Sequence, residues 1–177
     1  MSTKKNIFVI NGSASQNSSN EQLINHIAEW AKDFFDITIC PDLKTLPHFD
    51  PELSADNPPK EILIFREHIE RADGIIICTP EYVFSLPSGL KNAIEWCVAT
   101  TVFSDKPMGL ITASANGEKG HEALQLIMKT VVAKFTDETT LLIQGIKGKI
   151  DKQGKILAEK TQEDLVNFIQ AFKTLVA

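Results

Sequence analysis

Cysteine is scarce in this sequence, and the cysteines present have no metal-binding or redox spacing. Cys40, Cys78 and Cys97 lie far apart among apolar neighbours, and there is no CxxC motif. Isolated cysteines of this kind are typical of small, buried and reduced side chains. The four histidines form no HExxH or related pattern either, so we predict no metal site.

Long apolar runs and an excess of positive charge are also missing. No stretch approaches the roughly 18 apolar residues that span a bilayer, and the polar residues 1–6 do not resemble a secretory signal. The formal net charge is -5, which gives no electrostatic reason to expect nucleic acid or an anionic membrane as a partner. We therefore expect a cytoplasmic protein that acts on small molecules.

The sequence does contain a regular alternation of strand-length apolar runs and helical stretches. Its 177 residues suit one domain. The run 74–79 lacks polar alternation, which is typical of a strand covered on both faces. The pattern predicts one α/β domain, residues 1–177, with a doubly wound, five-stranded parallel sheet and helices on both faces. The predicted strands span 7–11, 37–40, 74–79, 108–113 and 140–143, and the predicted helices span 21–35, 58–72, 89–100, 118–135 and 162–176.

In a doubly wound sheet, ligands bind beyond the carboxyl ends of the strands, where the winding direction reverses. The loops that follow Asn11, Thr79 and Ala113 are therefore the candidate site. A longer loop, residues 41–59, contains five prolines and is expected to lie over one side of the sheet.

The first of these loops, residues 11–20, has the composition of a phosphate site. Seven of its ten residues are Ser or Asn. Backbone amides and the helix macrodipole make a helix N-terminus attractive to anions, and Ser13, Ser18 and Asn20 can add side-chain hydrogen bonds. The loop has neither GxxxxGK[ST] nor GxGxxG, which disfavours ATP-type and dinucleotide sites. Simple helix capping by Ser18, Ser19 or Asn20 remains compatible with phosphate binding.

The second loop offers rigid and aromatic walls. Residues 80–96 read PEYVFSLPSGLKNAIEW, so two prolines stiffen a loop that carries Tyr82 and Phe84. A planar heterocycle needs such walls together with backbone groups that face its polar rim.

Three segments together resemble the NADPH-dependent FMN reductase family, whose members have a flavodoxin-like fold. Residues 80–96 resemble that family's PEYN-x-S-x-P-x-x-LKNAIDW motif, and GSASQNSSN at 12–20 resembles its GSxRxxSxN. Residues 114–123 resemble its S-x-x-G-x-x-G-x-x-A turn, and 46–50 also look like a family segment. The matches follow the family's order along the chain.

The resemblance, with the loop composition, implies a set of cofactor-binding residues. The residues expected to bind FMN are Gly12, Ser13, Ser15, Ser18, Ser19, Asn20, Pro80, Glu81, Tyr82, Val83, Ser85, Ser114 and Gly117. Lys91, Asn92 and Trp96 also match, but we interpret them as helix and interface positions. Two residues depart from the family pattern: Ser15 stands where an arginine is usual, and Val83 where an asparagine is usual.

The reaction implied by the resemblance is hydride transfer from NADPH or NADH to FMN, followed by electron transfer to a small acceptor such as a flavin, quinone, azo dye or metal oxyanion. The cofactor performs the difficult chemistry, so no catalytic side chain is predicted. Glu81 is interpreted as a group that holds a loop amide or a neighbouring subunit, in preference to a general base. Family members are commonly homodimers or homotetramers, and we expect the same here.

Two other functions remain open. The protein could be a flavodoxin-like electron carrier, although the segment 80–96 and the modest charge argue against this. It could also be a non-enzymatic FMN-binding protein that has lost turnover through the changes at Ser15 and Val83.

Overall fold

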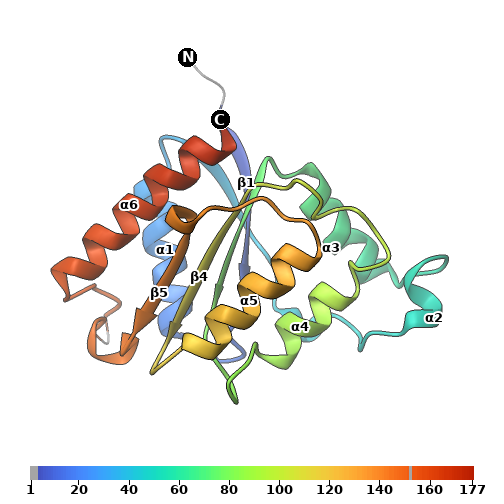
Figure 1. The fold of residues 1–177 in the computed structure, drawn as a ribbon, viewed down its shortest axis with the longest axis horizontal. Coiled ribbons are helices and arrows are strands. Elements are labelled where there is room, and N and C mark those ends of the chain that lie inside the picture. Colours follow the sequence, from blue (N-terminus) through green and yellow to red (C-terminus); the bar gives the residue numbers. More distant parts are fainter. Residues whose placement is uncertain (1–3, 152) are drawn as a thin grey trace.

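Five parallel strands form the centre of the structure, a computed structural model that describes residues 4–151 and 153–177. Neighbouring strands are parallel throughout and lie in the order β2-β1-β3-β4-β5 (Figure 1). This order confirms the predicted doubly wound sheet, with the winding direction reversing between β1 and β3. The strands are β1 (Lys5–Asn11), β2 (Phe35–Ile39), β3 (Gly74–Thr79), β4 (Met108–Ser114) and β5 (Thr140–Gln144).

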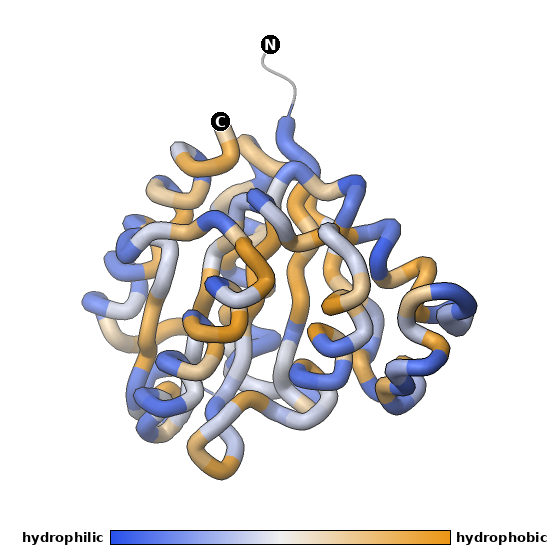
Figure 2. Tube along the Cα trace, turned by 45° about the vertical axis from the view of Figure 1, so that its right-hand side comes forward, coloured by the Kyte–Doolittle hydropathy of each residue, from blue (hydrophilic) through white to orange (hydrophobic). Residues whose placement is uncertain are grey.

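Helices cover both faces of the sheet, as predicted. Helices α1 (Ser19–Ala31) and α6 (Glu159–Val176) pack on one face. The other face is covered by α3 (Lys60–Arg71), α4 (Ser88–Glu95) and α5 (Glu118–Thr130). Every residue of β3 is buried, which explains its lack of polar alternation. Figure 2 shows the resulting apolar strands in the interior of the molecule.

Three predicted helices extend too far, and one of them, α4, ends at Glu95 although the sequence predicts a helix up to residue 100. Helix α1 ends at Ala31, because Phe35 pairs with Lys5 as the first residue of β2 and packs its ring edge-on against Phe172 at 5.7 Å. Helix α5 ends at Thr130. Beyond it the chain turns through Val132 at φ 60°, and Lys134 then forms a parallel bridge with Pro107, just before β4.

The proline-rich segment 41–59 contains two short helical turns, η1 (Leu43–Thr45) and α2 (Pro51–Ser54). Helix α4 fixes the middle of this segment. Asn92 Nδ2 and Trp96 Nε1 both donate to the Pro47 carbonyl, at 2.9 and 2.8 Å, and Asn92 Oδ1 accepts from the Phe49 amide. Asn92 and Trp96 thus join two of the segments in which the sequence resembles the family.

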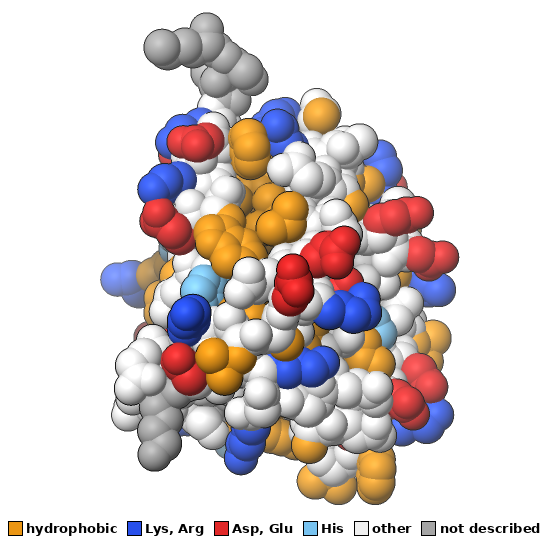
Figure 3. All heavy atoms as spheres, turned by 90° about the vertical axis from the view of Figure 1, so that its left-hand side faces the viewer, with side chains coloured by type: hydrophobic (Ala, Val, Ile, Leu, Met, Phe, Trp, Pro, Cys, Tyr) orange, Lys and Arg blue, Asp and Glu red, His pale blue; other side chains and the backbone are white. Residues whose placement is uncertain are grey.

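The cysteines are free thiols. Cys78 and Cys97 are buried and Cys40 is partly buried. No helix in the described part of the chain is long and apolar enough to cross a membrane. On the face shown in Figure 3, acidic and basic side chains are intermixed.

Candidate functional site

The loops that follow β1, β3, β4 and β5 meet at the carboxyl edge of the sheet, the lower edge in Figure 1, and surround an open cleft of about 760 Å³. Small-molecule sites commonly occupy roughly 300–1,000 Å³. The cleft is lined by Ser13, Ser15, Gln16, Asn17, Ser18, Ser19, Asn20, Pro80, Tyr82, Ala113, Ser114, Ala115, Gly145, Ile146, Lys147 and Gly148.

The first loop is held close to β3 at its start and capped at its end. Gly12 donates its amide to the Cys78 carbonyl at 2.9 Å, and a Cβ on Gly12 would lie 2.4 Å from Thr79 Oγ1. At the other end, Ser18 Oγ accepts from the Glu21 amide at 3.2 Å. The next residues, Ser19 and Asn20, begin α1, and a helix leaves its first amides without intrahelical partners. The cleft therefore has backbone donors suited to an anion.

The Asn20 side chain has an internal role that differs from the expected phosphate contact. It is 3% exposed, and its Nδ2 donates to the Ala113 carbonyl at 3.1 Å. The Cys78 thiol approaches its Oδ1 at 3.3 Å. Asn20 therefore ties α1 to β3 and β4, and only its backbone remains for a ligand.

The second loop begins with a tight two-residue turn. Tyr82 and Ser85 exchange two backbone hydrogen bonds of 2.9 and 3.0 Å, and Val83 and Phe84 between them have φ of 52° and 56°. This left-handed conformation is rare for a β-branched or aromatic residue. Val83 is 95% exposed and Phe84 73%, and Figure 2 shows a hydrophobic loop projecting from the lower edge.

Tyr82 extends from this turn to the first loop. Its pKa is lowered, chiefly by the neighbouring Ser15 side chain, with smaller contributions from Ser13, the Ala14 backbone and Lys44; partial burial opposes them. The phenol thus joins the walls that the β1 and β3 loops give to the cleft.

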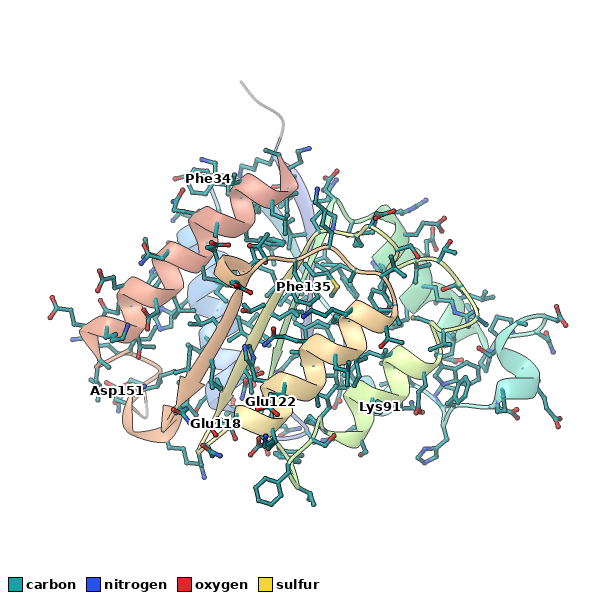
Figure 4. The ribbon with its side chains drawn as sticks, in the orientation of Figure 1. Phe34, Lys91, Glu118, Glu122, Phe135 and Asp151 are labelled. Carbon is teal, nitrogen blue, oxygen red and sulfur yellow. The ribbon has the colours of Figure 1, made fainter. Side chains whose placement is uncertain are left out.

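The Glu81 carboxylate lies against the N-terminus of helix α5. Its Oε2 accepts from the Gly120 amide in the first turn of α5 at 2.7 Å, so it holds a helix amide where a loop amide or a neighbouring subunit was expected from the sequence. A Cβ on Gly120 would lie 3.0 Å from Glu81 Cβ, so the close approach favours glycine. Figure 4 shows Glu118 and Glu122 on the same lower part of α5. The first turn of α5 carries one acidic residue, Glu118, as that of α1 carries Glu21, and the Glu81 carboxylate adds a second negative charge that complements the macrodipole of α5.

The structure brings eight of the thirteen predicted residues together around the cleft. These are Ser13, Ser15, Ser18, Ser19, Asn20, Pro80, Tyr82 and Ser114. The other five do not line it: Gly12, Glu81, Val83, Ser85 and Gly117 shape or join the loops. Gly117 adopts φ 89° at the start of α5, a conformation that favours glycine.

Sequence reasoning missed a fourth wall of the cleft, residues 145–148 after β5. None of these four residues is among the thirteen cofactor-binding residues predicted from the sequence. The signal that could have found it is topological, because the carboxyl end of β5 must lie at the same edge as those of β1, β3 and β4. Among the described residues that line the cleft, Lys147 carries the only charged side chain.

A comparison with models of protein families shows which family this chain belongs to. Residues 5–137 match the model described as NADPH-dependent FMN reductase, a span that contains the loops after β1, β3 and β4. The chain belongs to the NADPH-dependent FMN reductase family. It is an oxidoreductase that uses FMN with NADPH or NADH, and a small molecule accepts the electrons.

Individual relatives of this FMN reductase family member extend along nearly its whole length. A 2-hydroxy-1,4-benzoquinone reductase from Burkholderia sp. is 30% identical, covering 96% of this chain and 95% of its own. A quinone reductase from Escherichia coli (strain K12) is 27% identical, covering 97% and 95%. Among solved structures, the flavoenzyme NAD(P)H:(acceptor) oxidoreductase FerB from Paracoccus denitrificans has a TM-score of 0.80 and 25% identity, covering 97% of each chain.

Proposed function

We propose that this chain passes electrons from NADH or NADPH to quinones through FMN held in the cleft at the sheet edge. The observation that carries the proposal is the meeting of four loops around this cleft, with the unpaired amides of α1 at one wall. The quinone assignment is supported by the named activities of the Burkholderia and E. coli relatives.

The residues present fit the cofactor. Hydroxyls of Ser13, Ser15 and Ser18, with the amides at the start of α1, would hold the phosphate. Pro80, Tyr82 and Ser114, which lie along other walls of the same cleft, would position the ring system. When bound, FMN supplies the hydride and electron chemistry. The protein binds, orients and shields it, and we assign no catalytic acid or base.

The expected assembly is a homodimer or homotetramer formed by one FMN-binding domain, residues 1–177, per chain. The exposed pair Val83 and Phe84, beside the cleft, supports association, because apolar side chains at 95% and 73% exposure gain by being covered. Light scattering should give a mass at least twice that of one chain. The three free thiols support a reducing compartment, the cytoplasm.

The test of the function is a titration followed by an assay. We expect the purified protein to bind FMN, seen in the visible spectrum, and to lose the oxidised flavin bands on anaerobic addition of NADH or NADPH. Adding benzoquinone should restore them. If FMN does not bind at saturating concentration, the proposal is wrong. FMN binding without oxidation of either nucleotide would favour the electron carrier or the non-enzymatic binding protein.

A further inference from the structure

The first loop contains no cation, although it is the segment expected to meet a phosphate. Residues 11–20 include neither Lys nor Arg, and Ser15 stands where the family pattern has an arginine. A dianion held by neutral hydroxyls and amides alone lacks the ion pair, a hydrogen bond in which both partners are charged, that an ammonium or guanidinium provides. The remaining cleft walls are therefore the place to look for the missing charge.

Lys147 meets this need by its position. It lines the same cleft as Ser15, Ser18 and Ser19, and no other charged side chain does so among the described residues. No carboxylate of the described chain lies within 4 Å of its ammonium group. Its charge is consequently not neutralised by a carboxylate among the described residues.

The backbone around Lys147 is fixed at three points. Gly145 adopts φ 61° and donates its amide to the Ala115 carbonyl at 3.0 Å, which joins this loop to the β4 loop. Ile146 is 4% exposed and belongs to the apolar core on the face of the sheet that α1 and α6 cover. The amide of Gly148 then donates back to the Gly145 carbonyl at 3.0 Å. The lysine therefore projects from a short, anchored turn.

Lys44 is another cation near the first loop, and it is less suited than Lys147 to bind a phosphate in the cleft. It lines a separate hollow of about 230 Å³ on the β2 side of that loop. Its ammonium lies 4.0 Å from Asp42 Oδ2, so part of its charge is compensated.

We propose that the Lys147 ammonium binds the phosphate of FMN and replaces the arginine that is absent at Ser15. This inference rests on the proposed function, because it concerns the same cleft and the same cofactor. It assigns a binding role to the loop after β5, which lies beyond the span that matches the family model.

The test compares two flavins that differ only in the phosphate. Dissociation constants of FMN and riboflavin are measured by flavin fluorescence for wild type, Lys147→Ala, Lys147→Arg and Lys149→Ala at 50 and 300 mM salt. For Lys147→Ala, we expect the FMN constant to rise about tenfold or more, while the riboflavin constant stays within about twofold. Its FMN binding should also depend less on salt.

The two other variants are the controls. Lys147→Arg keeps the charge and should bind FMN nearly as wild type. Lys149→Ala removes the same charge two residues away, outside the residues that line the cleft, and should leave both constants unchanged. Equal weakening of FMN and riboflavin by Lys147→Ala, or none, would overturn the role of Lys147 while leaving the FMN proposal intact. A wild-type protein that binds neither flavin would overturn both.

Discussion

At the scale of single residues, the backbone conformation at Val83 explains why the family pattern has asparagine at this position, where this chain has valine. In the structure, Val83 is 95% exposed, has φ 52° and does not line the cleft. Asparagine tolerates left-handed backbone far better than valine. Backbone geometry is therefore sufficient reason for asparagine at this position.

Val83→Asn should stabilise the protein. Left-handed backbone costs an ordinary L-residue roughly 1–2 kcal/mol, and we expect relief of about 1 kcal/mol in the free energy of unfolding, measured with urea. Val98→Asn is the matched control, because Val98 is also exposed but is not among the described residues with positive φ. A Val83 variant no more stable than wild type would show that the turn is not strained.

The buried side chain of His121 should make the stability of the protein depend on pH. Its Nδ1 lies 2.9 Å from Thr112 Oγ1, and burial lowers the pKa of His121. The unfolded chain, with a histidine pKa of about 6.5, therefore takes up the proton first as pH falls. The contribution of His121 to stability is complete above about pH 6.5 and declines below it.

Urea unfolding at pH 7.5 and 5.5 measures this effect. His121→Gln should lose less stability than wild type between the two pH values, even if it is less stable at both. His48→Gln, which removes an exposed histidine from the segment 41–59, should follow the wild-type decline. If His121→Gln declines as steeply as wild type, the buried histidine is not the source.

At the scale of elements, the approach of the β1 loop to β3 depends on Gly12. A Cβ there would lie 2.4 Å from Thr79 Oγ1 and 2.6 Å from Thr79 Cβ, and Thr79 is fully buried. Gly12→Ala should therefore lower the free energy of unfolding by about 1–3 kcal/mol.

Gly148→Ala is the control for this substitution, because a Cβ at that glycine meets nothing within 4 Å. It should change stability by no more than about 0.5 kcal/mol. Thermal unfolding of the two variants checks both values. If Gly12→Ala leaves the free energy of unfolding unchanged, the β1 loop can move away from Thr79 without cost.

The strands were more predictable from sequence than the ends of the helices. Uninterrupted apolar runs such as 74–79 mark buried strands directly. Helix ends depend on tertiary contacts, which the sequence does not display. Phe35 fits the apolar stripe of a helix, yet it pairs in β2. Similarly, α4 ends at Glu95 where residues up to 100 were expected, and the Trp96 carbonyl accepts hydrogen bonds from the buried Arg66.

The candidate site was predictable where loop composition carried the signal. The Ser and Asn residues of 11–20 and the stiff loop after β3 were found in this way. Lys147 was not, because a lysine in a polar turn has no distinctive pattern. Only the sheet order places that turn beside the first loop.

At the scale of the whole molecule, bound FMN should stabilise the fold. The cleft joins loops from four of the five strands, so the site exists only when the sheet is assembled. A ligand that binds only the folded state at 100 times its dissociation constant adds about 2.7 kcal/mol to stability. Calorimetry should show a midpoint that rises with FMN concentration and rises less with equal riboflavin. An unchanged midpoint with FMN would contradict binding at this edge.

The full or partial burial of the three thiols has a consequence for the quinone reduction proposed above. Burial raises the pKa of Cys40 and of Cys97 to about 12, and it raises that of the enclosed Cys78 as well. Quinones are electrophiles, and sulfur attacks electrophiles and peroxides as the thiolate. Near neutral pH these sulfurs stay protonated, which slows their reaction with electrophilic acceptors.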